Sequence, residues 1–240
     1  MQRNRNKFLA CTVVVASFVF AASAHAQSTA AAADQYDYDI VIRNGRVLDG
    51  AGNPCIFADV AIKNGRFVKL GKISGRGRTE IDASGRYVSP GWIDMMDQSG
   101  IALPKNGLAE NKLMEGVTSA IGGEGGTPVP AEQIRDFWAS LEKGGISLNW
   151  GSYFSETQAR IAVIGYDSRQ PTPEELTKMK SIMETAMQNG AMGMTTALIY
   201  PPSSYATTPE LIEMAKVAAK YGGIYASHMR GEGKDRKSVV

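Results

Sequence analysis

The stretch VSPGWIDMMDQ, residues 88–98, decides the fold because the pattern of the sequence changes there. Before it, short β-branched runs alternate with turn dipeptides. After it, strand-like and helix-like segments alternate, which is typical of β/α units built around a parallel sheet. The stretch itself is an apolar strand introduced by Pro90-Gly91. The sequence therefore predicts an α/β protein in which this strand is the first of a parallel series.

The segments after this strand carry clear start and stop signals. Thr172 followed by Pro173 combines a capping side chain with a residue favoured at the first helical position. The same helix is predicted to end at Asn189-Gly190, a helix-ending pair. Its methionines recur every four residues, which favours core packing over a special surface. We expect strands at 91–96, 117–121, 148–153, 191–197 and 224–228, and helices at 133–141, 173–189 and 209–221.

Residues 38–88 have the pattern of a small β domain. Asn44-Gly45 and Asn64-Gly65 each separate apolar runs, and Asn-Gly in that position is the strongest short-range signal for a hairpin. The runs on either side are rich in isoleucine and valine, which favour strands. The sequence predicts a small antiparallel unit that ends near Tyr87.

The two ends of the chain do not continue these patterns. Residues 1–26 combine a basic start, an apolar run and an Ala-His-Ala cleavage signal, which predicts a secretory signal peptide. We therefore expect an exported protein, periplasmic or secreted. Residues 27–37 contain an alanine-rich run and are expected to form a flexible leader. Residues 235–240 continue no earlier pattern and are interpreted as a non-native tail.

Removal of the signal peptide changes the composition that bears on partners. It takes away three of the 26 basic residues and none of the 24 acidic ones, so the net charge becomes −1. No basic patch remains to favour nucleic acid or an anionic membrane, and we expect neither as a partner. Cys55 is the only cysteine left, which excludes an internal disulfide. His228 is the only histidine left.

Six motifs follow one another along the chain: GVTS at 116–119, GYD at 165–167, PEE at 173–175, GAMGMTT at 190–196, YPP at 200–202 and YASHMR at 225–230. In order and spacing they resemble the amidohydrolase superfamily, and within it the N-acyl-D-amino-acid deacylases, or D-aminoacylases. The resemblance covers about residues 38–233. It implies an incomplete TIM-type (β/α)8 barrel at 89–234, with about five of eight strands, preceded by part of a small β-sandwich domain at 38–88. The chain is then an N-terminal fragment of a longer parent.

The resemblance also implies a metal site that departs from the family pattern. Family members place His-x-His at the end of the first barrel strand, where this chain has Met96 and Gln98. A thioether and a carboxamide are poor ligands for zinc. Glu124, in a glycine-rich turn, takes the place of a cysteine ligand, and His228 matches the histidine that ends the fifth strand. We therefore expect a divalent metal, one zinc, on Glu124 and His228.

Three further residues are candidates for the substrate pocket. Asp97 and Gln98 lie at or beside the lost His-x-His, and Tyr200 lies on the loop after the fourth strand, beside two prolines. Ser155-Glu156 stands where the family often has Gly-His. The resemblance puts the catalytic aspartate beyond residue 240, so no catalytic residue is assigned.

The function implied is metal-dependent hydrolysis of linear, non-peptide C–N amide bonds, as in the D-aminoacylases. The partner is then a small-molecule amide, an N-acyl-D-amino acid or a related D-residue compound. A catalytically silent relative that binds a small molecule is the alternative that Met96, Gln98 and Glu156 favour. A cyclic-amide or dipeptide hydrolase on the same scaffold is a further possibility, since a fold does not fix the substrate. The chain as it stands is expected to be inactive, because its ligand set is incomplete.

Overall fold

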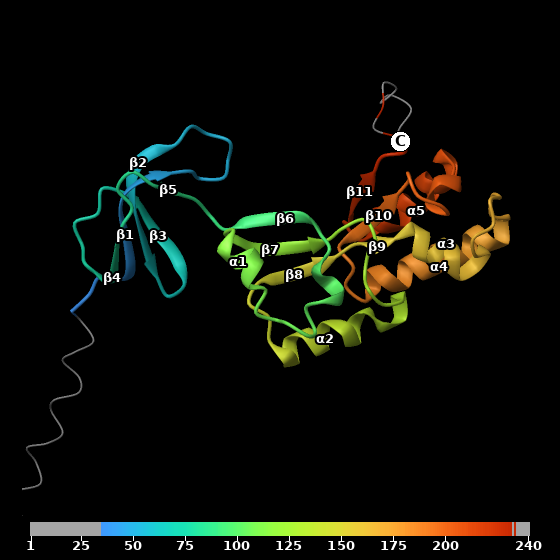
Figure 1. Ribbon diagram of the computed structural model, residues 1–240, viewed down its shortest axis with the longest axis horizontal. Coiled ribbons are helices and arrows are strands. Elements are labelled where there is room, and N and C mark those ends of the chain that lie inside the picture. The colour runs from blue at the N-terminus through green and yellow to red at the C-terminus, as the bar shows by residue number, and fades with distance from the viewer. Residues whose placement is uncertain (1–34, 232, 234–240) are drawn as a thin grey trace, which may run out of the picture. The chain divides into compact units, whose positions relative to one another are not determined.

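A computed structural model describes residues 35–231 and 233. The chain divides into two compact units between Pro90 and Gly91, and each is described by itself (Figure 1). The predicted signal peptide, residues 27–34 of the predicted leader and the predicted tail at 235–240 lie outside the described residues. Within the described part of the chain, none of the helices is long and apolar enough to cross a bilayer.

The first unit is a single β-sheet. Its strands are β1 (Tyr38–Val47), β2 (Ile56–Lys63), β3 (Arg66–Gly71), β4 (Gly77–Asp82) and β5 (Tyr87–Val88). They are ordered β3-β2-β1-β4, and β5 also pairs with β1. The hairpin predicted at Asn64-Gly65 is confirmed: it joins β2 and β3, and both residues have positive φ, 53° and 69°. That conformation suits the tight turn between antiparallel strands.

Two predictions for this unit are wrong. Asn44-Gly45 forms no hairpin, because β1 runs straight through it. Asn44 has a φ of 60°, and between Ile42 and Gly45 strand β1 gains one residue over β2, which is a β-bulge. The left-handed residue that would have made a turn makes a bulge instead. The sheet is also mixed rather than antiparallel, since β4 and β5 pair parallel to β1.

The second unit is α/β, as predicted. Its strands are β6 (Trp92–Asp97), β7 (Val117–Gly122), β8 (Asn149–Ser152), β9 (Phe154–Ser155), β10 (Gly193–Ala197) and β11 (Ile224–His228). All pairs are parallel, in the orders β6-β7-β8 and β9-β10-β11. The strand predicted at 148–153 is split at Tyr153 into β8 and β9, so one segment contributes to both sheets. Within each sheet, neighbouring strands therefore follow one another in the order in which they occur along the chain.

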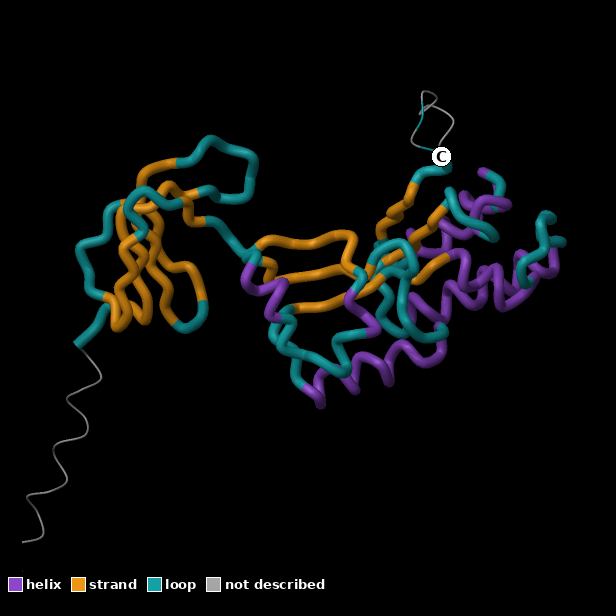
Figure 2. Tube along the Cα trace, in the orientation of Figure 1, coloured by secondary structure: helices purple, strands orange, loops and turns teal. Residues whose placement is uncertain are grey.

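Five α-helices lie between these strands, and Figure 2 shows the alternation. They are α1 (Glu110–Met114), α2 (Ile134–Gly144), α3 (Glu156–Ile164), α4 (Pro173–Gln188) and α5 (Thr208–Lys220). Helix α4 begins as predicted, with reciprocal bonds between Thr172 and Glu175. Its methionines Met179, Met183 and Met187 are buried in the main core, as their spacing predicted. Helices α1 and α3 were not predicted.

Candidate active site at the strand ends

The candidate residues gather at the carboxyl ends of the parallel strands. Asp97 ends β6, Glu124 follows β7, Tyr200 follows β10 and His228 ends β11. Asp97 and Glu124 lie at the strand ends of one parallel sheet and Tyr200 and His228 at those of the other, and such ends are where α/β enzymes place their sites. Side chains far apart in the sequence are thereby brought to one edge of the unit.

Glu124 and His228 are in direct contact. The Nδ1 atom of His228 lies 3.0 Å from Oε2 of Glu124, and both side chains are about three-quarters buried. The ring of Tyr200 meets the His228 ring edge to face, with 5.5 Å between centroids. A carboxylate and an imidazole are both good zinc donors. The pair that the sequence singled out is therefore assembled in the fold.

Glycines bring Glu124 to this place. A Cβ on Gly123 would lie 2.7 Å from the sulfur of Met96 and 3.2 Å from its backbone. Gly126 has a φ of 71°, and a Cβ there would lie 2.5 Å from the backbone nitrogen of Ser155. Only residues without a side chain fit at both positions. The turn after β7 can therefore pack against the ends of β6 and β9 with Glu124 between these two glycines.

The pair has the chemistry of a metal site without a full ligand set. Among residues 35–231 and 233, no group of three or more His, Cys, Asp or Glu side chains is placed to hold a metal ion. A structural zinc site usually has four protein ligands and a catalytic one three. Glu124 and His228 fit as two donors, so a metal bound there needs at least one further ligand from outside the described residues or from water.

Asp97 is held by neighbours on all sides. It is 1 % exposed, and Oδ2 accepts hydrogen bonds from Trp150 Nε1 at 2.7 Å and from the Ser99 backbone at 3.0 Å. Lys112 Nζ lies 3.0 Å from Oδ1. Burial alone would raise the pKa of Asp97, but the hydrogen bonds from Ser99, Trp150 and Lys112 outweigh it and hold the pKa below its ordinary value. Asp97 is thus a fixed anion.

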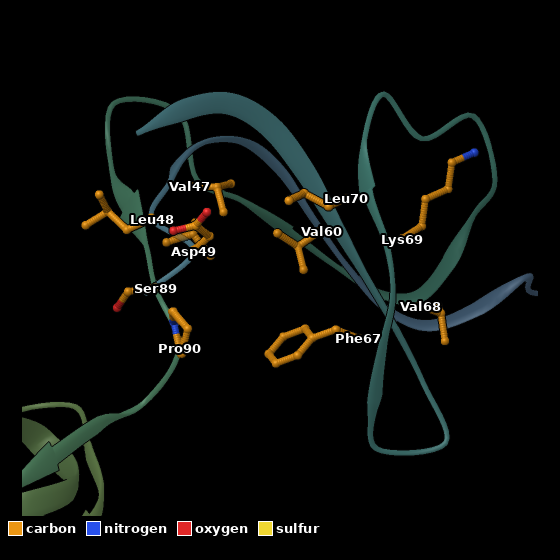
Figure 3. Close-up of a pocket in the computed structure, with 11 residues that line it drawn as sticks. Val47, Leu48, Asp49, Val60, Phe67, Val68, Lys69, Leu70, Ser89 and Pro90 are labelled. Atoms are coloured by element: carbon orange, nitrogen blue, oxygen red, sulfur yellow. The ribbon is translucent and has the colours of Figure 1, made fainter. Parts of the chain in front are cut away.

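Gln98 and Asp97 share a small cavity of about 180 Å³. Trp150 and the glycine-rich turn after β7 form other walls of it. Both residues thus line a cavity. The β unit has an apolar cavity of about 340 Å³, lined by residues such as Val47, Phe67 and Pro90 (Figure 3). Its lining is mostly apolar and contains neither Asp97 nor Gln98, so it is separate from the cavity at the strand ends.

A buried acidic cluster lies at the start of α3 and α5. Glu156, Arg160 and Glu210 are 0, 0 and 3 % exposed. Arg160 Nη1 donates to both Glu210 oxygens, at 2.7 and 2.9 Å. Neither oxygen of Glu156 has a hydrogen-bond partner within the described residues. These three side chains, two carboxyls and one guanidinium, have no net charge only if one of the carboxyls holds a proton.

That proton belongs on Glu156. Burial is the main cause that raises the pKa of Glu156, to about 8. The nearby Glu210 carboxylate raises the pKa further, in part by charge repulsion, against a smaller opposite effect of Arg160 and Arg230. Glu156 was noticed in the sequence only as a departure from the family pattern. Arg160 and Glu210 were missed, although Glu210 lies in the first turn of a predicted helix.

Replacement of Glu156 by glutamine is expected to flatten the pH dependence of stability. Because the folded pKa of about 8 exceeds the ordinary 4.5, the folded state keeps a proton that the unfolded state has lost between these values. The free energy of unfolding should therefore fall as the pH rises from about 4.5 to about 8. Urea denaturation across this range measures the fall.

In the Glu156→Gln variant, the free energy of unfolding should no longer show this fall with rising pH. The exposed Glu142 on α2 supplies the control, because Glu142→Gln should keep the wild-type profile. Parallel profiles for wild type and Glu156→Gln would contradict the assignment of the proton.

Comparison with known proteins identifies the class to which this arrangement belongs. No protein-family model matches the chain. A D-aminoacylase from Alcaligenes xylosoxydans xylosoxydans is 30% identical over 223 residues, which are 84% of this chain and 46% of that protein. The chain thus spans about half the length of the curated relatives that it matches.

Solved structures give the same result. A D-aminoacylase described as defining a subset of the amidohydrolases is 29% identical, with a TM-score of 0.74 over 82% of this chain and 46% of that one. An N-acyl-D-glutamate deacylase from Bordetella bronchiseptica, bound to zinc and a phosphonate inhibitor, is 27% identical, with a TM-score of 0.70 over 81% of this chain and 46% of that one.

The chain is therefore related to the amidohydrolases. Within that superfamily its relatives are the N-acyl-D-amino-acid deacylases, which confirms the resemblance predicted from the six sequence motifs.

Proposed function

We propose that the full-length protein is a metal-dependent hydrolase of linear amide bonds that acts on N-acyl-D-amino acids or related D-residue compounds. The contact between Glu124 and His228 carries this proposal, because it places two zinc donors 3.0 Å apart at the strand ends. The D-aminoacylase and the N-acyl-D-glutamate deacylase found by comparison support the substrate class. These relatives are enzymes, so a catalytically silent binder is the less favoured function.

We further propose that residues 89–234 are the N-terminal part of a TIM-type barrel and that 38–88 are part of a β-sandwich. Parallel strands in chain order support this arrangement. The two outermost strands also expose large apolar side chains: Trp92 and Ile93 of β6 are 59 and 61 % exposed, and Ile224 of β11 is 49 % exposed. Further strands of a closed barrel would cover them. Export after cleavage of residues 1–26 completes the proposal.

The metal is proposed to be a single zinc ion held by Glu124 and His228. Met96 and Gln98 support one ion over two, since neither side chain is a good zinc ligand. A structure of D-aminoacylase is described in terms of activation by one metal and attenuation by a second. When bound, a zinc ion polarises the scissile carbonyl and lowers the pKa of its water.

The chain's own residues supply the surroundings of that ion. Glu124 and His228 would hold the ion. The glycines around Glu124 fix the turn that carries this carboxylate. Asp97, engaged by Lys112 and Trp150, is an anion that shapes the adjoining cavity rather than a free base. Gln98 and Tyr200 would bind the substrate through hydrogen bonds of the amide and the phenol.

The full-length protein should hydrolyse N-acetyl-D-amino acids in preference to their L enantiomers. Release of the free amino acid from enantiomeric pairs with acidic, polar and apolar side chains measures this preference. A chelator should abolish turnover, and added zinc should restore it. A correctly folded full-length protein that turns over none of these compounds at any zinc concentration would contradict the proposal.

A further inference from the structure

The loop from β10 to α5, residues 198–207, is held by side chains from outside it. Three successive carbonyls of this loop accept hydrogen bonds. Arg230 Nη1 donates to Ser204 at 2.9 Å, and Arg230 Nη2 donates to Ala206. The carbonyl between them, that of Tyr205, accepts from Gln170 Nε2 at 2.9 Å. Side chains from two other segments therefore fix the backbone at 204–206.

This loop positions Tyr200 beside His228. The Tyr200 ring lies 5.5 Å from the His228 ring, centroid to centroid. Its backbone nitrogen bonds the Ala197 carbonyl at 2.9 Å, and the Ser204 nitrogen bonds the Tyr200 carbonyl at 2.9 Å. Ser204, whose carbonyl accepts a hydrogen bond from Arg230, is thus itself hydrogen-bonded to Tyr200.

Arg230 follows His228 by two positions on the same chain segment. Its half-buried guanidinium ties the loop to the strand end that supplies the histidine. A planar fork with several donors can engage two carbonyls at once, whereas an ammonium group is a single flexible point. An arginine is therefore suited to join the strand end and the loop in one fixed geometry.

We propose that Arg230 is a positioning residue for the reaction: it holds the loop at 204–206 so that Tyr200 stays against His228 beside the metal. This inference rests on the proposed function for its kinetic consequence, and on the hydrogen bonds alone for its structural one. In this role Arg230 contacts neither the proposed zinc ligands, Glu124 and His228, nor the substrate. It acts through Tyr200.

A double-mutant cycle in the full-length enzyme tests the kinetic consequence. Arg230→Ala and Tyr200→Ala should each lower kcat/KM by roughly 10- to 100-fold, since a displacement of about 1 Å at a site can cost that much. Because both variants disturb one element, the double variant should be little worse than either single one. Zinc per chain should stay unchanged, and Arg230→Lys should recover part of the loss.

Hydrogen exchange tests the structural consequence without any assay of activity. Amides at 198–207 should exchange faster in Arg230→Ala than in wild type. Arg135→Ala is the control, because Arg135 also donates to one carbonyl, that of Gln188, from the exposed face of α2. It should change neither kcat/KM nor exchange in the loop.

The two sources of failure are distinguishable. Multiplicative losses in the double-mutant cycle, or unchanged exchange at 198–207 in Arg230→Ala, would overturn the role of Arg230. If wild type is inactive, the proposed function fails, and the exchange measurement alone still decides whether Arg230 holds the loop.

Discussion

Replacement of Arg160 by methionine is expected to lower the free energy of unfolding by about 3–5 kcal/mol, the usual cost of breaking a buried ion pair. Arg160 is fully buried and bonds both oxygens of Glu210. It also donates to the backbone carbonyls of Asp167 and Arg169. Without it, the buried Glu210 carboxylate would lose the partner of its ion pair. Urea denaturation of the full-length protein at neutral pH measures the loss.

Arg169→Met is the matched control for this prediction. Arg169 also forms ion pairs, with Glu175 at 2.7 Å, but its side chain is 45 % exposed. Exposed pairs contribute little, so its loss should be below about 1 kcal/mol. Adding Glu156→Gln and Glu210→Gln to Arg160→Met should recover part of the stability, because the buried charge is then removed. Equal losses for the two arginines would show that the cluster is not what stabilises this region.

The parts of the fold that were predictable are those where local signals and long-range packing agree. Strand β11 was predicted at its observed bounds, because Ile224–His228 is an apolar run closed by two polar residues. Helix α4 was predictable from the Thr172 cap. Helix α3 was missed, although Ser155 and Gln158 form a capping box that the sequence spacing allowed. The bulge at Asn44 was not predictable, because a hairpin and a bulge use the same left-handed residue.

The candidate site was predictable only where a residue type was rare. His228 and Glu124 stood out as a lone histidine and a lone acid among glycines, and the fold brings them into contact. Arg160 and Glu210 are 50 residues apart and lie on helices, where charged residues are normally solvated. Nothing in their spacing shows that both are buried. The role of Arg230 was hidden for the same reason, since its partners are backbone carbonyls.

Loss of metal is the second large effect expected. Glu124→Ala and His228→Ala should each remove most of the bound zinc, because each would take away one of the two proposed donors. Amide hydrolysis should fall with occupancy, by at least about 100-fold for an enzyme that depends on its metal. Glu132→Ala, which removes an exposed carboxylate from the short helix before α2, should keep both metal and activity.

Elemental analysis of the purified full-length protein tests the central claim most directly. We expect about one zinc ion per chain in wild type and in Glu132→Ala, and little in Glu124→Ala and His228→Ala. Thermal melting should show that the four proteins remain folded, so that loss of metal is separated from loss of structure. Two tightly held ions per chain in wild type, or full occupancy in either Glu124→Ala or His228→Ala, would contradict the assignment of this site.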